Sequence, residues 1–195
     1  MSDYAIVAVA EPRKRRSTEE SEVGQLEFAF DQDKAVEAIL VIANRIPDPT
    51  LHSVTHLLYF ADKTSLEKYG RFICGDDYYA MEHGPVPSNT YDLLKEAAKT
   101  DEFGFQTDGY RVLPLRGPDI DKLSDSDIEC LVQATDTYGA APFWKVKAES
   151  HDEAYEAAWN ARGISRRQRM PVESIVALLE NSDKLLSFLA TRHAK

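Results

Sequence analysis

Residues 50–70 read TLHSVTHLLYFADKTSLEKYG and carry the clearest helical pattern of the chain. Thr50 is a typical N-cap residue, and Gly70 is a typical C-terminal stop. The apolar residues between them recur at three- and four-residue spacing, which places them on one face of a helix. These residues are Leu51, Val54, Leu57, Leu58 and Ala61. The stretch therefore predicts a long helix whose apolar face packs into a core.

Weaker patterns predict further helices on both sides of this one. A helical period begins at Lys34 and ends before Pro47, and Ser88 is predicted to cap a helix after the Gly-Pro-Val-Pro turn of residues 84–87. Ser124 and Asp127 have the spacing of a capping box at the start of another helix. Later helical patterns cover residues 143–148, 152–162, 172–179 and 183–192.

Two stretches predict strands instead. Residues 76–81 are predicted to form a short strand, and residues 103–113 alternate apolar and polar side chains around an Asp108-Gly109 turn. Such alternation around an Asp-Gly pair is typical of a β-hairpin. The predicted fold class is therefore α+β, predominantly α-helical, with a small antiparallel β-sheet or hairpin.

Composition restricts the classes of partner. The chain has 195 residues, enough for one domain, and 23 basic against 33 acidic residues give a net charge of −10. This balance argues against binding to nucleic acids or anionic membranes, which requires basic surface. Residues 38–43 form the longest apolar stretch, too short to span a bilayer. Two cysteines make no disulfide framework, so we expect a cytoplasmic protein.

Charge also divides the chain. Residues 1–33 hold four basic and eight acidic residues in blocks, including Arg13 to Arg16 and the acidic stretch of residues 17–22. Such blocks are typical of a solvated arm. We therefore predict a charged, flexible N-terminal arm over residues 1–33 and a folded domain over residues 34–195.

No constellation of residues predicts catalysis. His52 and His56 have the i, i+4 spacing of zinc ligands, but they lack the glutamate of the zinc-protease motif and a third ligand. No serine, cysteine or threonine lies in a known nucleophile motif. A cluster of four arginines between Arg162 and Arg169 favours a solvated loop or local ion pairs over a phosphate contact. We expect no enzyme activity, cofactor or metal, and a hydrolase using His52 and His56 is kept as an alternative.

The central block resembles a known family. Four runs of this block are similar to the SocA-like antitoxins. They are His56 to Asp62, Tyr69-Gly70-Arg71, residues 75–87 with Gly84-Pro85-Val86-Pro87, and Tyr91 to Lys95. Their domain is also called the Panacea domain and was formerly a domain of unknown function. Residues 123–131 and 150–154 resemble the later helices of the same family, so the resemblance spans about residues 34–160.

The resemblance implies a bacterial or phage antitoxin that binds a toxin protein, usually encoded by an adjacent gene, and blocks it. One member of the family is an adaptor that delivers its toxin to a cytosolic ATP-dependent protease. An adaptor or regulatory protein is therefore the alternative, with the arm or the C-terminal end of residues 192–195 as the bound segment. No catalytic residues are established for the family.

Aromatic side chains on a rigid turn can bury area in an interface with little loss of entropy. The central block combines such side chains with the proline-rich turn, although the same aromatics, Met81 and Tyr91 among them, could equally pack the core. The candidate partner-binding residues are Tyr69, Tyr78, Tyr79, Met81, His83, Pro85, Val86, Pro87 and Tyr91. We then expect the N-terminal arm and the late helices to determine which partner the protein binds.

Overall fold

The computed structural model describes residues 26–193. Its α-helices are α1 (Gln32–Arg45), α2 (Leu51–Tyr69), α3 (Ser88–Glu96), α4 (Asp125–Tyr138), α5 (Phe143–Ser150), α6 (Glu153–Ala161), α7 (Val172–Val176) and α8 (Ser182–His193). Strands β1 (Tyr78–Met81), β2 (Gly84–Pro87) and β5 (Gln168–Arg169) form an antiparallel sheet in the order β2-β1-β5. Strands β3 (Phe105–Asp108) and β4 (Arg111–Pro114) form a separate hairpin. The predicted α+β, predominantly helical class is confirmed.

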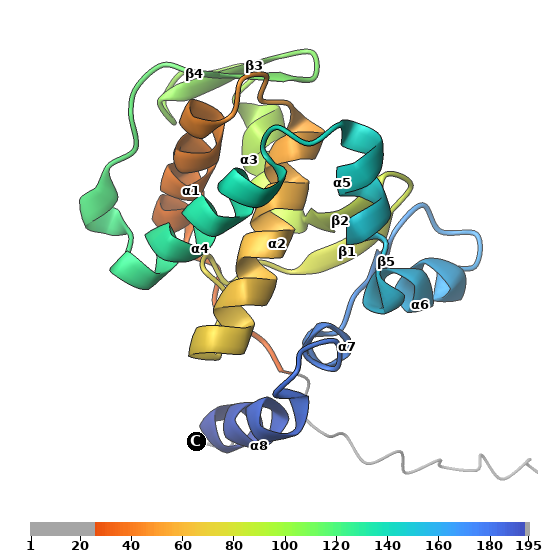
Figure 1. Ribbon diagram of the computed structural model, residues 1–195. Coiled ribbons are helices and arrows are strands. Elements are labelled where there is room, and N and C mark those ends of the chain that lie inside the picture. The colour runs from red at the N-terminus through yellow and green to blue at the C-terminus, as the bar shows by residue number, and fades with distance from the viewer. Residues whose placement is uncertain (1–25, 194–195) are drawn as a thin grey trace, which may run out of the picture.

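Helix α2 lies at the centre of the domain. In Figure 1 it runs between α1, α4, α5 and the β1–β2 hairpin, and it packs against each of them. Thr50 and Ser53 close its first turn as a capping box, and Gly70 ends it in the left-handed conformation at a φ of 66°. Both ends are as the sequence predicts. Burial is wider than one face, however, because side chains all around the helix are covered.

The helix after the Gly-Pro-Val-Pro turn shows a correction to the predicted cap. Ser88 is the first residue of α3 and makes no side-chain cap, and Pro87 occupies the N-cap position. The buried carboxylate of Asp76 replaces the cap: it accepts hydrogen bonds from the backbone N–H groups of Asn89 and Thr90, at 2.9 and 2.7 Å. A residue far upstream in sequence therefore satisfies the free donors of this helix end.

Two buried acids of other helices are held by cations. Asp127 of α4 pairs with Lys34 at 2.8 Å and with Arg71 at 2.6 Å, and it forms the predicted capping box with Ser124. Although burial opposes the ionised form, the hydrogen bond from Lys34 and the further ones around it lower the pKa of Asp127. Glu37 of α1 is likewise buried, and Arg116 donates to both of its carboxylate oxygens. These pairs fasten α4 and the segment after β4 to α1.

Asp62 of α2 is also buried, but no lysine or arginine among residues 26–193 pairs with its carboxyl group. Its two carboxylate oxygens accept hydrogen bonds of 2.7 Å each from the backbone N–H of Ile73 and the hydroxyl of Tyr78. Burial raises the pKa of Asp62 to about 7, although both hydrogen bonds act in the opposite direction. The carboxyl group therefore ties α2 to β1 and to the segment that follows the helix.

The N-terminal part of the predicted arm lies outside the described residues, as do residues 194–195. The last residues of that arm lie against the domain. The backbone N–H of Leu26 donates to Glu173 of α7, and that of Asp31 donates to the carbonyl of Cys74. Leu26 is buried, and Asp31 caps α1. Among the described residues, no helix is both long and apolar enough to cross a membrane.

The raised pKa of Asp62 predicts a pH dependence of stability. A carboxyl group whose pKa is higher in the folded chain than in the unfolded chain loses stabilising energy as pH rises between the two values. Here these are about 7 and the ordinary 3.8. From about pH 5.5 to pH 8 we expect Asp62→Asn to gain about 2 kcal/mol in free energy of unfolding relative to the parent chain.

Urea unfolding of both proteins at several pH values measures this difference. Asp101→Asn, which changes an exposed aspartate, is the matched control and should show a difference that stays constant with pH. If the Asp62→Asn difference is equally constant, the carboxyl group of Asp62 does not carry the raised pKa.

Candidate functional site

Exposed aromatic side chains gather around one end of α2. Tyr110, Phe143 and Trp144 are 69%, 49% and 71% exposed, and each of these values is high for a ring. The imidazole of His52 lies beside two of them: its centroid is 5.5 Å from that of Tyr110 and 5.6 Å from that of Phe143, and it is 5.2 Å from the ring of His83. Trp144 directly follows Phe143 in the chain. We call these five residues, His52, His83, Tyr110, Phe143 and Trp144, the aromatic surface.

Four segments far apart in sequence build the aromatic surface on fixed backbone: the start of α2, the β1–β2 turn, the β3–β4 turn and the start of α5. Tyr110 is in the β3–β4 turn, and its carbonyl accepts a 2.8 Å hydrogen bond from the backbone N–H of Leu51. Val112 of the same hairpin donates to the carbonyl of Pro49 at 2.9 Å. Phe143 and Trp144 open α5, directly after Pro142. The rings are therefore presented on backbone that is held before any partner binds.

The side chain of His56 is buried under the aromatic surface and holds two parts of it together. Its ring is buried, with Nδ1 2.5 Å from the carbonyl oxygen of His52 and Nε2 2.9 Å from that of His83. Burial lowers the pKa of His56 to about 4, although the two carbonyls favour the protonated ring. The side chain thus joins the start of α2 to the β1–β2 turn, which positions the half-buried His52 and the exposed His83.

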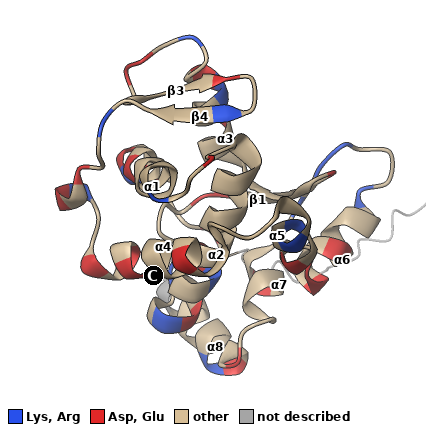
Figure 2. Ribbon diagram, turned by 45° about the horizontal axis from the view of Figure 1, so that its top comes forward, with Lys and Arg blue, Asp and Glu red and all other residues tan. Residues whose placement is uncertain are grey.

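Basic groups surround the aromatic surface in a chain that is acidic overall. Figure 2 shows α5 as a basic helix on this side, where it carries Lys145 and Lys147. Burial, followed by the charges of His83 and Lys147, lowers the pKa of His52. Lys145 pairs loosely with Glu149 at 3.9 Å. The aromatic centre therefore has a polar, partly basic rim.

An apolar pocket adjoins the aromatic surface on the α1–α2 side. It has a volume of about 290 Å³ and lies between the end of α1, the end of α4 and the start of α5. Phe143 forms one wall, and the remaining lining includes Ile46, Leu57, Ala141 and Val146. A partner that contacts Phe143 could place an aliphatic side chain in this pocket.

The candidate residues from the sequence occupy different environments. His83 is exposed and belongs to the aromatic surface. Tyr69 is exposed too, but it lies at the other end of α2, about 25 Å from His52 at 1.5 Å per residue, and donates to Glu129. The buried members are Tyr78, Pro85 and Pro87, and the half-buried ones are Tyr79, Met81, Val86 and Tyr91. Partner contact by these residues stays a prediction.

Sequence reasoning did not single out Tyr110, Phe143 and Trp144. An aromatic residue directly after the Asp108-Gly109 turn is a signal of exposure, because a hairpin tip has no layer above it. The Phe143-Trp144 pair follows Pro142 at a helix start, where one of two adjacent rings must face away from the core. Neither signal shows that the rings of Tyr110 and Phe143 meet at His52.

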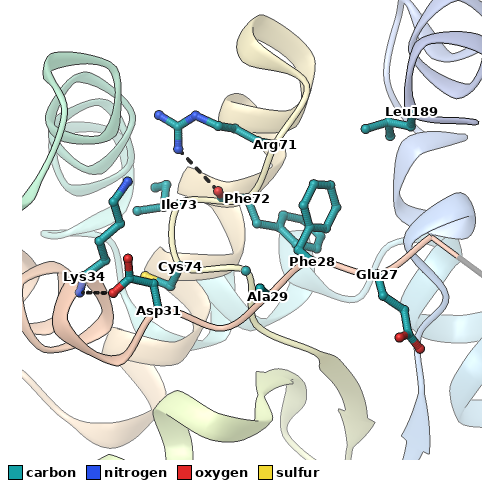
Figure 3. A pocket seen from close by; sticks show the side chains of 11 residues that line it. Glu27, Phe28, Ala29, Asp31, Lys34, Arg71, Phe72, Ile73, Cys74 and Leu189 are labelled. Atoms are coloured by element: carbon teal, nitrogen blue, oxygen red, sulfur yellow. Dashed lines mark hydrogen bonds between the residues drawn. The ribbon is translucent and has the colours of Figure 1, made fainter. Parts of the chain in front are cut away.

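Another pocket lies elsewhere, between residues 27–31, the 71–75 segment and α8. Figure 3 shows Phe28 and Phe72 at its wall, Leu189 on the α8 side, and Lys34 and Arg71 nearby. Its volume is about 410 Å³. Because Lys34 and Arg71 already pair with the buried Asp127, these cations are not free to bind an anion.

The histidines do not form a metal centre. Both ring nitrogens of His56 face backbone carbonyls, so this residue has no nitrogen directed at an ion. Within residues 26–193, no three His, Cys, Asp or Glu side chains are grouped as metal ligands. The arrangement of His52, His56 and His83 therefore serves positioning.

Gly84 in the β1–β2 turn allows the close approach of His56. Its φ is 133°, and a Cβ at this position would lie 2.5 Å from His56 Nε2 and 3.2 Å from Ser150 Oγ. We expect Gly84→Ala to lower the free energy of unfolding by about 3 kcal/mol, because backbone strain and a clash in the core add up. Chemical denaturation measures the loss.

Gly109→Ala separates the two causes. Gly109 also has a positive φ, at 60°, but no atom lies within 4 Å of its added Cβ. This variant should lose only the strain energy, about 1 kcal/mol. Equal losses for the two variants would show that His56 does not fill the space beside Gly84.

One of three comparisons with known proteins identifies the family of this chain. Residues 54–160, more than half of the chain, match the family model described as antitoxin SocA-like, Panacea domain. Searches of curated proteins and of solved structures returned no match. The matched range begins in α2 and ends in α6, so it contains the central helix, both hairpins and most of the aromatic surface. The chain therefore belongs to the SocA-like antitoxin family and carries its Panacea domain.

Proposed function

We propose that this protein neutralises a toxin by binding it directly through the aromatic surface, without catalysing a reaction. The family supports an antitoxin-like role with a protein partner. The single observation that carries the choice of surface is that the exposed rings of Tyr110 and Phe143 both lie beside His52, with the exposed Trp144 next to Phe143 in the chain. The toxin is expected to be encoded by an adjacent gene, and the complex to form in the cytoplasm.

The physical reason is the energy that such rings contribute to interfaces. Binding energy in protein complexes is concentrated in a few residues, with tryptophan and tyrosine enriched among them. These side chains have few rotatable bonds, so fixing them costs little entropy. Here the backbone under Tyr110 and Phe143 is already held by hydrogen bonds and by the start of a helix. The apolar pocket beside Phe143 offers a place for a partner side chain.

Loss of the rings should abolish neutralisation without unfolding the antitoxin. We expect Tyr110→Ala and Trp144→Ala each to weaken toxin binding by about 30-fold, the effect of losing a typical hot-spot residue. The double variant should fail to rescue growth when the adjacent gene is co-expressed. Binding is measured by calorimetry on purified proteins, and folding by circular dichroism.

Ile164→Ala is the matched control, because Ile164 is a fully exposed apolar residue on the α6–β5 loop, outside the aromatic surface. It should bind and rescue like the parent chain. If the folded double variant still binds the toxin at parental affinity, the aromatic surface is not the binding site. If the adjacent gene product is harmless and forms no complex, the antitoxin role itself is wrong.

A further inference from the structure

A basic loop outside the aromatic surface has no part in the proposed toxin contact. Residues 162–169, here called the arginine loop, contain Arg162, Arg166, Arg167 and Arg169 and no acidic residue. The loop connects α6 to β5 and projects at the right of Figure 1. Its last two residues form β5, and β5 pairs with β1 through Tyr79 and Ala80.

The arginine loop has a defined shape. The backbone N–H of Ser165 donates to the carbonyl of Arg162 at 3.0 Å, and the Ser165 hydroxyl donates to the carbonyl of Arg167 at 2.7 Å. The guanidinium of Arg162 stacks on Trp159 at 3.5 Å from the ring centroid, and that of Arg167 lies 4.8 Å from the ring of Tyr79. These contacts hold the guanidinium groups of Arg162 and Arg167 in place before an anion binds.

Within residues 26–193, only one of the four arginines of the arginine loop pairs with carboxylates. Arg169 pairs with Asp77 at 2.7 Å and with Glu27 at 3.5 Å. Among the residues that the structure describes, Arg162, Arg166 and Arg167 have no carboxylate partner, and both Arg166 and Arg167 are exposed. In a chain of net charge −10, three such arginines in one loop form a local site for acidic groups.

The chain brings its own acidic segment to this place. Glu27 already contacts Arg169, and Glu22 precedes Glu27 by only five residues, which span at most about 17 Å when extended. Glu19, Glu20 and Glu22 carry three negative charges, matching the three arginines that have no carboxylate partner among residues 26–193. A tethered segment also has a high effective concentration at its site, which an acidic segment of another molecule lacks.

We propose that the acidic stretch of residues 17–22 binds the arginine loop of the same chain. Glu19, Glu20 and Glu22 supply carboxylates to Arg162, Arg166 and Arg167, continuing the contact that Glu27 makes with Arg169. The inference is independent of which surface binds the toxin.

Paramagnetic NMR on the full chain tests the contact directly. A nitroxide label on Ser21→Cys reports on backbone amides nearby, and Cys74 and Cys130 are buried, which directs labelling to the new thiol. At low salt we expect the amide signals of residues 163–167 to lose most of their intensity. The loss should reverse when salt is raised, because screening weakens exposed ion pairs.

Charge variants supply the controls. Replacing Glu19, Glu20 and Glu22 by Gln in the labelled chain should restore the signals of residues 163–167. Replacing Arg13, Lys14 and Arg15 by Gln, a matched triple change farther from Leu26, should leave the loss intact. Arg166→Glu with Arg167→Glu should restore the signals too, and adding Glu19→Arg with Glu20→Arg should bring the loss back.

Two outcomes would overturn the proposal. The first is full intensity of the amide signals of residues 163–167 at low salt in the labelled parent chain. This outcome counts against the proposal even if an added acidic peptide or oligonucleotide shifts those same signals. The second is an intensity loss that persists after the three glutamates are replaced by Gln, because the contact would then not depend on their charge.

Discussion

The fold depends on a row of polar side chains along the buried central helix. His56, Tyr59 and Asp62 follow one another at three-residue spacing on α2, and all are at most 1% exposed. Each reaches a different part of the chain: His56 the β1–β2 turn, Tyr59 the α6 cap Asp152, and Asp62 the hydroxyl of Tyr78. Because a buried polar group without a partner is costly, these contacts specify which segments surround the helix.

This row explains what the family pattern encodes. Tyr78 and Gly84 belong to the matched range, and both are required by α2: Tyr78 as a donor to Asp62, and Gly84 because His56 leaves no room for a Cβ. Such residues define the scaffold. The rings of Tyr110 and Trp144 are 69% and 71% exposed, so most of each ring lies outside the core.

Local sequence patterns predicted most helices and strands. The features that they did not predict depend on contacts between residues far apart in sequence. The caps at Thr50 and Ser124 and the hairpin around Gly109 followed from neighbouring residues. The cap of α3 did not, because Asp76 lies outside the local window of that helix. The two-residue strand β5 exists only through its pairing with β1. The aromatic surface needs four separate segments to meet, so only His83 was among the predicted site residues.

The central claim is that the aromatic surface is where the antitoxin meets its toxin. Hydrogen exchange on the free protein and on the complex tests it most directly. We expect slower exchange in the complex at the β3–β4 turn around Tyr110 and in the first turns of α5, with α8 and the Tyr69 end of α2 unchanged. Slower exchange confined to α8 or to the Tyr69 end would contradict the claim.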